Sequence, residues 1–193
     1  MLISLTAVSL SSFAQKNSDD KVYRQMIADR SWKIIQKIHL QDTLAALKVR
    51  DIIAGHYIAL NEIYQRRDSL KTSQIVVDSA VSKLHQPFLK KLAVYLNPDQ
   101  VIQVKDGLTY GVSPITYAAY LDMLPQLTEV QKSQIMVWLT EAREKAMDAE
   151  SSEKKHGWFK KYKGRINNYL SAGGIDMKKE GEAWQERIKA RAH

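Results

Sequence analysis

The spacing of apolar residues predicts α-helices along most of this chain. Between residues 46 and 64, between 75 and 95, and between 135 and 146, apolar side chains recur at intervals of three and four. That interval places them on one face of a helix, which must then pack against a core. No segment shows a convincing alternation of apolar and polar residues, which would indicate a strand. The pattern therefore predicts an all-α protein built as a helical bundle.

Capping signals divide this pattern into seven or eight helices. Thr128 and Gln131 have the spacing of a capping box. Asn97 and Ser113 each precede a proline, which is favoured at the first position of a helix. Asp106-Gly107 is expected to end the helix between them and to open a loop that runs to Ser113. The expected helices cover roughly residues 19–38, 42–70, 73–95, 98–105, 114–124, 128–146, 152–170 and 176–190.

The N-terminal segment, residues 1–14, has the features of a secretory signal peptide. It carries no charge, contains an apolar stretch and ends in Ser12-Phe13-Ala14, with small residues where signal peptidase cuts. The alternative is that these residues form only the frayed start of the first helix. We expect cleavage after Ala14, a single helical domain over residues 15–193, and a secreted or periplasmic location.

Composition limits the classes of protein that remain. Of 193 residues, 45% are hydrophobic, and only eight are glycine and four are proline, which suits one well-packed core. The absence of cysteine excludes disulfides, thiolate metal sites and cysteine nucleophiles. No run approaches the ~20 apolar residues of a membrane-spanning helix, so no transmembrane segment is expected.

The positive charge is concentrated near the C-terminus. Residues 151–193 hold eleven Lys and Arg against five Asp and Glu, in a chain whose net charge is +8. Such a surplus suits nucleic acid, a membrane surface or an anionic glycan, and it is also compatible with a solvated helix face. Because export makes nucleic acid the poorest of these partners, we expect a carbohydrate partner and no nucleic-acid partner.

The run from His156 to Tyr169 is the richest in ligand-binding chemistry. It combines aromatic rings with four Lys or Arg and two adjacent amides. Pyranose rings stack on flat aromatic faces, and their hydroxyls need polar partners because an unpaired buried polar group costs about 1–3 kcal/mol. The alternative is that the aromatic stripe packs into the bundle. The candidate ligand-binding residues in this run are Trp158, Tyr162, Lys163, Arg165, Asn167 and Asn168.

The expected loop before Ser113 is the natural second wall of such a site, because loops held by rigid helices often carry binding residues. Asp106 is equally suited to a structural ion pair with Arg165 or Lys163, or to turn chemistry before Gly107. The candidate ligand-binding residues on this wall are Asp106, Thr109, Tyr110 and, just beyond it, Tyr117.

Catalytic signatures are weak. Glycoside hydrolysis needs two carboxylates across a cleft, and the candidates are Asp51, Asp106, Glu141 and Asp148. Glu141, Glu144 and Asp148 follow helical spacing, which is typical of a solvated face. The five histidines show no paired metal-ligand spacing, and no phosphate loop or nucleophile elbow is present. We therefore expect no cofactor and no metal, and we name no catalytic residue.

Three expected helix starts place leucine ahead of a polar cap. They are Leu40-Gln41-Asp42, Leu96-Asn97-Pro98-Asp99-Gln100 and Leu127-Thr128-Glu129-Val130-Gln131. This pattern resembles the helix starts of the LTxxQ family of Spy-like periplasmic chaperones. A leucine in this position is also an ordinary hydrophobic staple.

Longer runs carry a second resemblance, which extends over most of the chain. These runs are Val49-Arg50-Asp51-Ile52-Ile53, Lys105-Asp106-Gly107-Leu108-Thr109-Tyr110-Gly111-Val112, Glu141-Ala142-Arg143-Glu144-Lys145-Ala146-Met147-Asp148-Ala149 and the segment from Lys155 to Leu170. They resemble an uncharacterised family of secreted bacterial all-helical proteins, a domain of unknown function described as sugar-binding. The resemblance implies a signal peptide, a helical fold and a carbohydrate ligand, and it transfers no catalytic residue.

Two classes of function follow from these observations. The first is a secreted or periplasmic binding protein that holds a carbohydrate on its aromatic, basic and amide-rich helix. The alternative is a periplasmic chaperone or stress protein of the LTxxQ type, which would grip unfolded clients on a broad apolar and basic surface. A glycan-active enzyme is third. The sequence sets no oligomeric state.

Overall fold

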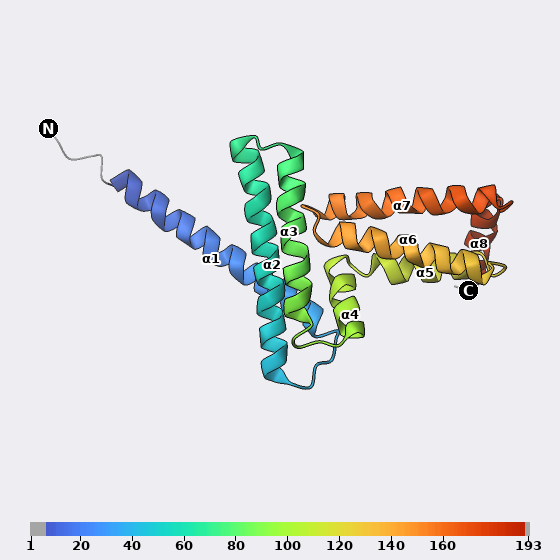
Figure 1. Cartoon of the computed structure of the whole chain (residues 1–193), viewed down its shortest axis with the longest axis horizontal. Coiled ribbons are helices and arrows are strands. Elements are labelled where there is room, and N and C mark those ends of the chain that lie inside the picture. The colour runs from blue at the N-terminus through green and yellow to red at the C-terminus, as the bar shows by residue number, and fades with distance from the viewer. Residues whose placement is uncertain (1–6, 192–193) are drawn as a thin grey trace. The chain divides into compact units, whose positions relative to one another are not determined.

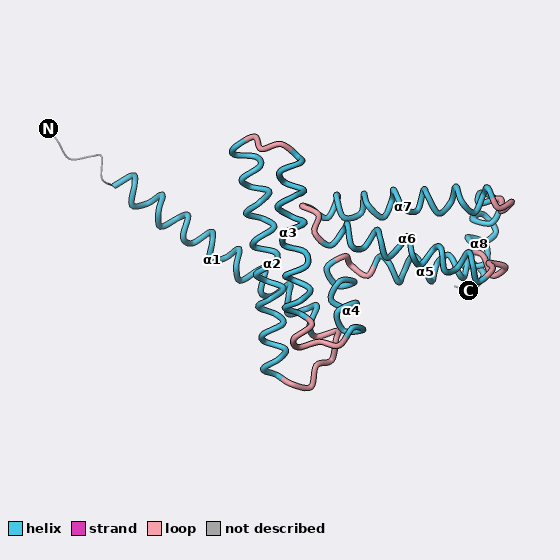
Figure 2. Tube along the Cα trace, in the orientation of Figure 1, coloured by secondary structure: helices cyan, strands magenta, loops and turns pink. Residues whose placement is uncertain are grey.

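The computed structural model describes residues 7–191, and the surroundings of side chains from residue 19 onward. Over these residues the chain forms eight α-helices and no strand (Figure 1), which confirms the predicted all-α class. The turns that join them are short (Figure 2). In chain order the helices are α1 (Ala7–Ile35), α2 (Thr43–Leu70), α3 (Gln74–Leu92), α4 (Pro98–Leu108), α5 (Val112–Met123), α6 (Glu129–Met147), α7 (Ser152–Ala172) and α8 (Met177–Arg191).

The predicted caps are present at most of these helix starts. The Asp42 carboxylate accepts hydrogen bonds from the backbone N–H groups of Leu44 and Ala45. Thr128 and Gln131 form the predicted capping box, and the Asp176 carboxylate accepts from the first turn of α8. The three helix starts that resemble the LTxxQ pattern are therefore ordinary helix N-termini here.

The first helix starts earlier than the sequence pattern predicted. It begins at Ala7 instead of near residue 19, because the segment contains no glycine or proline that would interrupt a helix. Residues 1–6 of the predicted signal peptide lie outside the described residues, and the cleavage after Ala14 stays a prediction. No helix in the described part of the chain is long and apolar enough to cross a membrane.

The helices gather into two compact units, one up to Val101 and one from Ile102 onward. In the first unit, α2 packs against both α1 and α3. Its core includes Val49, Ile53 and Leu92, all fully buried. His56 is also buried and stacks on Phe88 with ring centroids 3.9 Å apart, so this histidine is part of the packing of the first unit.

In the second unit, α6 and α7 run antiparallel and α5 packs against α6 (Figure 1). One continuous apolar core joins them, and α8 contacts both α5 and α7. The fully buried side chains of this core are Leu124, Ile135, Leu139, Phe159, Ile166 and Leu170. The unit is therefore a small bundle whose longest helices, α6 and α7, present their outer faces to solvent.

The junction between α4 and α5 differs from the prediction. Asp106-Gly107 does not end α4, which continues to Leu108. A glycine inside a helix costs about 1 kcal/mol relative to alanine, but Leu108 is 1% exposed, and its burial favours one more helical turn. The residue that precedes α5 is Gly111, with φ of 69°, and Ser113 lies inside the first turn instead of capping it.

A polar clamp around Asp122 holds α8 against the C-terminal end of α5. The indole Nε1 of Trp184 donates to Asp122 Oδ2 at 2.6 Å, and Arg191 Nη1 donates to both carboxylate oxygens at 2.9 and 3.0 Å. Arg187 Nη2 donates to the backbone oxygen of Met123 at 2.9 Å. Because α8 has no fully buried side chain, this Asp122 clamp carries much of its attachment.

We expect Asp122→Asn to loosen α8 at neutral pH, because a neutral amide makes weaker bonds to Trp184 and Arg191 than a carboxylate does. In hydrogen-exchange mass spectrometry the α8 amides should exchange faster in the variant, while α6 and α7 stay unchanged. Equal exchange in α8 of both proteins would contradict the clamp.

The same comparison has a defined pH dependence. The bond from Trp184, and then the bond from Arg191, hold the pKa of the Asp122 carboxyl below its usual range. A lowered pKa means that the stabilisation is present above the ordinary aspartate value of about 3.9 and is lost as the pH falls through the folded value. The difference in α8 exchange between the two proteins should therefore disappear in acid.

Candidate functional site

The run His156–Tyr169 lies within α7. Its apolar, aromatic and basic side chains lie on different faces of this helix. Ser151 caps this helix by accepting a hydrogen bond from the backbone N–H of Lys154 at 3.2 Å. Phe159, Ile166 and Leu170 point into the core. Trp158, Tyr162 and Tyr169 are half-buried at the edge of that core, whereas the basic residues between them are exposed. Each ring therefore packs against the core and also keeps solvent-facing surface, and its part in ligand binding stays a prediction.

An open hollow of about 1080 Å³ lies along the N-terminal half of α7 and includes Val112 from the start of α5. We call it the α7 hollow. It contains one half-buried indole, that of Trp158, together with four lysines and one glutamate. Its lining residues are Val112, Glu153, Lys154, His156, Gly157, Trp158, Phe159, Lys160, Lys161 and Lys163.

A second, smaller hollow of about 380 Å³ lies on the outer face of α6 and is lined by Glu129, Val130, Ser133, Gln134 and Val137. It has no aromatic ring and no cation among its lining residues. The α7 hollow is therefore the better candidate for a polar ligand, because it combines stacking surfaces with hydrogen-bond donors.

A pair of stacked rings includes His156, which lines the α7 hollow. Tyr110 lies over His156 with ring centroids 5.6 Å apart and planes 11° from parallel. The Tyr110 side chain is 49% exposed, and its backbone has φ of 60°. A bulky residue in this left-handed region costs roughly 1–2 kcal/mol, and such strain often accompanies a functional position. The turn therefore holds an exposed ring in place at a cost in stability.

The four lysines of the α7 hollow lack carboxylate partners. No ion pair is present for Lys154, Lys160, Lys161 or Lys163 among the described residues, although Lys161 Nζ lies 5.3 Å from the centroid of the Trp158 ring. Other lysines of the same unit lie near acidic residues. Lys132 pairs with Glu129 and Lys189 with Glu186. Lys178 and Lys179 form no ion pair in the described part of the chain, but Asp176, Glu180 and Glu182 lie within four residues of them in the sequence. The surface positive charge of this unit is thus least compensated at the α7 hollow.

Four of the sequence-predicted residues on α7 do not line the α7 hollow. Arg165 lies 4.5 Å from the Trp138 ring centroid and 3.5 Å from Glu141. The Asn167 side chain accepts a hydrogen bond at 2.6 Å from the hydroxyl of Tyr120, whose burial raises its pKa to about 12. Burial, followed by the nearby Glu141 carboxylate, raises the pKa of Tyr162. Asn168 is exposed.

The residues predicted for the second wall of the site also lie in different surroundings. Tyr110 stands next to the α7 hollow, whereas Tyr117 is half-buried and packs against the core. Thr109 is fully buried, and its hydroxyl donates to the backbone oxygen of Lys105 at 2.8 Å. Of the ten predicted ligand residues, the structure brings Trp158 and Lys163 into the lining of the α7 hollow and Tyr110 beside it.

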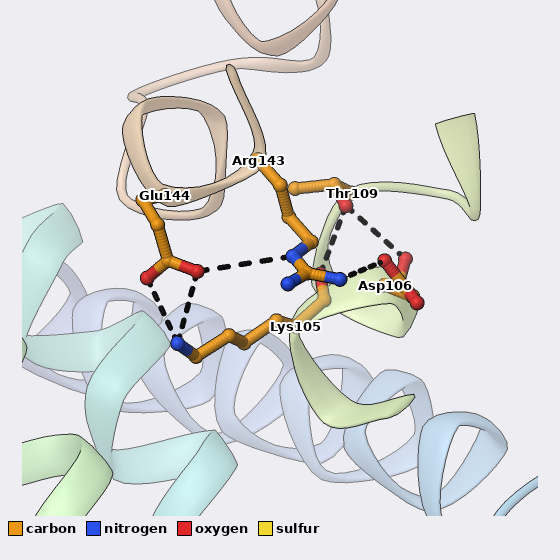
Figure 3. Close-up of polar contacts among 5 residues, drawn as sticks. All are labelled: Lys105, Asp106, Thr109, Arg143 and Glu144. Carbon is orange, nitrogen blue, oxygen red and sulfur yellow. Dashed lines mark hydrogen bonds and ion pairs between the residues drawn. The ribbon is translucent and has the colours of Figure 1, made fainter. Parts of the chain in front are cut away.

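Asp106 belongs to a charge network between α4 and α6 (Figure 3). Its carboxylate lies 3.0 Å from Arg143 Nη1, so its partner is Arg143 and not Arg165 or Lys163 as the sequence suggested. Beside it, the Lys105 ammonium donates to both oxygens of Glu144 at 2.9 Å. Arg143 Nε makes no hydrogen bond and lies 3.8 Å from Glu144 Oε1.

This network overturns the expectation that this stretch of α6 is a solvated face. The side chain of Arg143 is 9% exposed and that of Glu144 is 28% exposed, and Asp148 is buried. The predicted solvation applies only to Glu141, which is exposed. The helical spacing of charged residues therefore did not distinguish a solvent-exposed face of α6 from the face that contacts α4.

Three of the four candidate carboxylates for glycoside hydrolysis lie beside an arginine. Asp106 is held by Arg143, Glu141 lies beside Arg165, and Asp51 pairs with the adjacent Arg50 at 2.7 Å. Within residues 7–191, no group of His, Asp and Glu is arranged to hold a metal ion.

Comparison with known proteins gives a family and no activity. The sequence profile of a family described as "Protein of unknown function (DUF3826)" matches residues 24–75 and 65–190. The chain belongs to this family. Together the two matches cover α2 to α7 in full and most of α8. The matched residues therefore include those that line the α7 hollow. A search of curated proteins finds no match.

In this DUF3826 protein, sequence reasoning missed four residues of the α7 hollow: Lys154, His156, Lys160 and Lys161. A signal for them was available. Between Glu153 and Asp176 the chain has no acidic residue, so Lys160, Lys161 and Lys163 have no carboxylate partner one helical turn away. It also missed Lys155, whose buried ammonium donates to the backbone oxygens of Leu108 at 2.8 Å and Met147 at 3.2 Å.

We expect Asp106→Asn to destabilise the protein without changing any ligand binding at the α7 hollow, because Asp106 neutralises a buried guanidinium and does not line that hollow. The loss of this charge-assisted bond should lower the free energy of unfolding by about 1–3 kcal/mol. Urea denaturation followed by circular dichroism measures it. Weakened binding by a variant of unchanged stability would instead place Asp106 at the ligand.

Proposed function

We propose that this protein binds a carbohydrate at the α7 hollow and acts outside the cytoplasm without catalysing a reaction. The observation that supports it most is the half-buried indole of Trp158 in the lining of the α7 hollow, together with a second ring of that lining, His156, which stacks on Tyr110. Flat rings at an open surface offer the C–H faces of a pyranose a surface on which to stack.

The packing of these rings favours a binding role. Trp158 packs one part of its ring against the core of the second unit, which limits its rotation, so little conformational entropy is lost when a ligand stacks on the exposed part. The left-handed turn at Tyr110 and Gly111 fixes the Tyr110 ring in the same manner. A pre-organised aromatic surface suits a ligand that is itself rigid and flat.

Polar groups around the rings supply the hydrogen bonds that sugar hydroxyls require. Each lysine of the α7 hollow brings three N–H donors on a flexible stem, and Glu153 adds a carboxylate acceptor. Three of the four candidate carboxylates for catalysis, in contrast, lie beside an arginine. The chemistry at hand therefore supports capture of a glycan better than its cleavage.

The test is binding to a glycan array, followed by calorimetry with the best oligosaccharide. We expect Trp158→Leu to weaken binding about tenfold, equivalent to about 1.4 kcal/mol, because leucine keeps the apolar packing and removes the flat face. Tyr110→Asn should also weaken binding, and asparagine adopts the left-handed conformation more readily than tyrosine.

The matched control is Tyr95→Asn, which removes a tyrosine of similar exposure, 40%, from the first unit. It should bind as the unchanged protein does. Binding that survives both Trp158→Leu and Tyr110→Asn, in variants that melt at the same temperature as the unchanged protein, would rule out the α7 hollow as the site.

A further inference from the structure

We infer that the α7 hollow selects an anionic oligosaccharide, one that carries carboxylate or sulfate groups along its chain. This inference rests on the proposed carbohydrate binding and adds a charge requirement to it. It stands on the uncompensated lysines of α7, whereas the proposed function stands on the aromatic rings.

The first step is the charge balance of the lining. Four lysines line the α7 hollow against the single carboxylate of Glu153, and their ammonium groups have no ion pair within the part of the chain that the structure describes. Like charges close together on one helix repel one another and destabilise it. A concave surface with one sign of charge also concentrates the local potential and attracts an oppositely charged ligand.

The second step is the length over which the charges are spread. Lys154 and Lys161 lie four residues before and three residues after Trp158 on one α-helix, so both are on the same side of the helix as its indole. Their seven-residue separation corresponds to roughly 10 Å along the helix axis, and a single small anion meets only part of that length. An oligosaccharide that carries a charge on successive sugar units can meet both lysines while its rings lie against Trp158.

The third step concerns the type of cation. All four are lysines, whose compact ammonium group acts as a point charge and does not impose the bidentate geometry of a guanidinium. The arginines of the same unit serve structural contacts instead, as Arg143 does with Asp106 and Arg191 does with Asp122. Lysine is therefore the residue that this unit presents to solvent at the α7 hollow, and it accommodates carboxylate and sulfate alike.

The experiment compares matched acidic and neutral oligosaccharides by calorimetry. Oligomers of galacturonate, mannuronate and glucuronate are each paired with their methyl esters, and a sulfated galactan oligomer is paired with its desulfated form. In each pair the sugar ring is the same, and the negative charge is present in one member and absent from the other. We expect at least one acidic member to bind about tenfold or more tightly than its neutral partner, with an affinity that falls as salt increases. The uronate and sulfate pairs distinguish the two sources of charge.

The variant that tests the lysines is Lys154→Gln with Lys161→Gln. Both residues are exposed, and glutamine has a helix propensity close to that of lysine, so folding should be preserved. The matched control is Lys178→Gln with Lys179→Gln, which removes the same charge from exposed positions on α8. The first variant should lose the preference for the acidic member, and the second should keep it.

The outcomes separate this inference from the proposed function. Equal binding of acidic and neutral members, abolished by Trp158→Leu, would overturn the charge requirement and leave carbohydrate binding intact. Binding of no member would overturn both. If polyphosphate competed as well as the acidic oligomers and Trp158→Leu had no effect, the site would recognise charge alone, which would also overturn both.

Discussion

The second unit depends on one buried cation. Lys155, in the first turn of α7, donates to the backbone oxygens of Leu108 and Met147, which are the last residues of α4 and α6. Carbonyl groups at a helix C-terminus lack partners within the helix and carry the negative end of its dipole. One ammonium group therefore stabilises two helix ends and fixes the start of α7 against both. Its neighbours Lys154 and His156 consequently face the α7 hollow.

The sequence was sufficient for the fold because local signals agreed with one another. Polar caps such as Asp42 and Thr128 occur where the apolar periodicity restarts, and the structure begins helices there. One exception is Asp106-Gly107. Its preference for a turn contributes less free energy than the burial of Leu108, so α4 continues to Leu108. Long-range packing, which local sequence does not encode, decided that boundary and moved the cap of α5 to Gly111.

The sequence was less informative about the site, because a segment's composition does not state which face of the helix meets the core. Asn167 had suitable ligand chemistry but is hydrogen-bonded to Tyr120, and Asp106 is paired with Arg143. Both partners lie far away in the chain, so no local pattern predicts them. Conversely, the lysines at the α7 hollow could have been recognised, since the absence of acids between Glu153 and Asp176 is a property of the sequence itself.

The contrast between paired and unpaired cations gives the strongest reason to regard α7 as a functional surface. Exposed ion pairs contribute at most about 1 kcal/mol each. The stability of the fold therefore does not explain why the lysines of α7 have no acidic partners. The strained Tyr110, however, is exposed and gains little from burial. Strain and uncompensated charge both oppose folding, and they occur side by side around the same hollow. Stability alone does not explain why these two costs coincide, whereas a ligand that stacks on the rings and neutralises the lysines accounts for both.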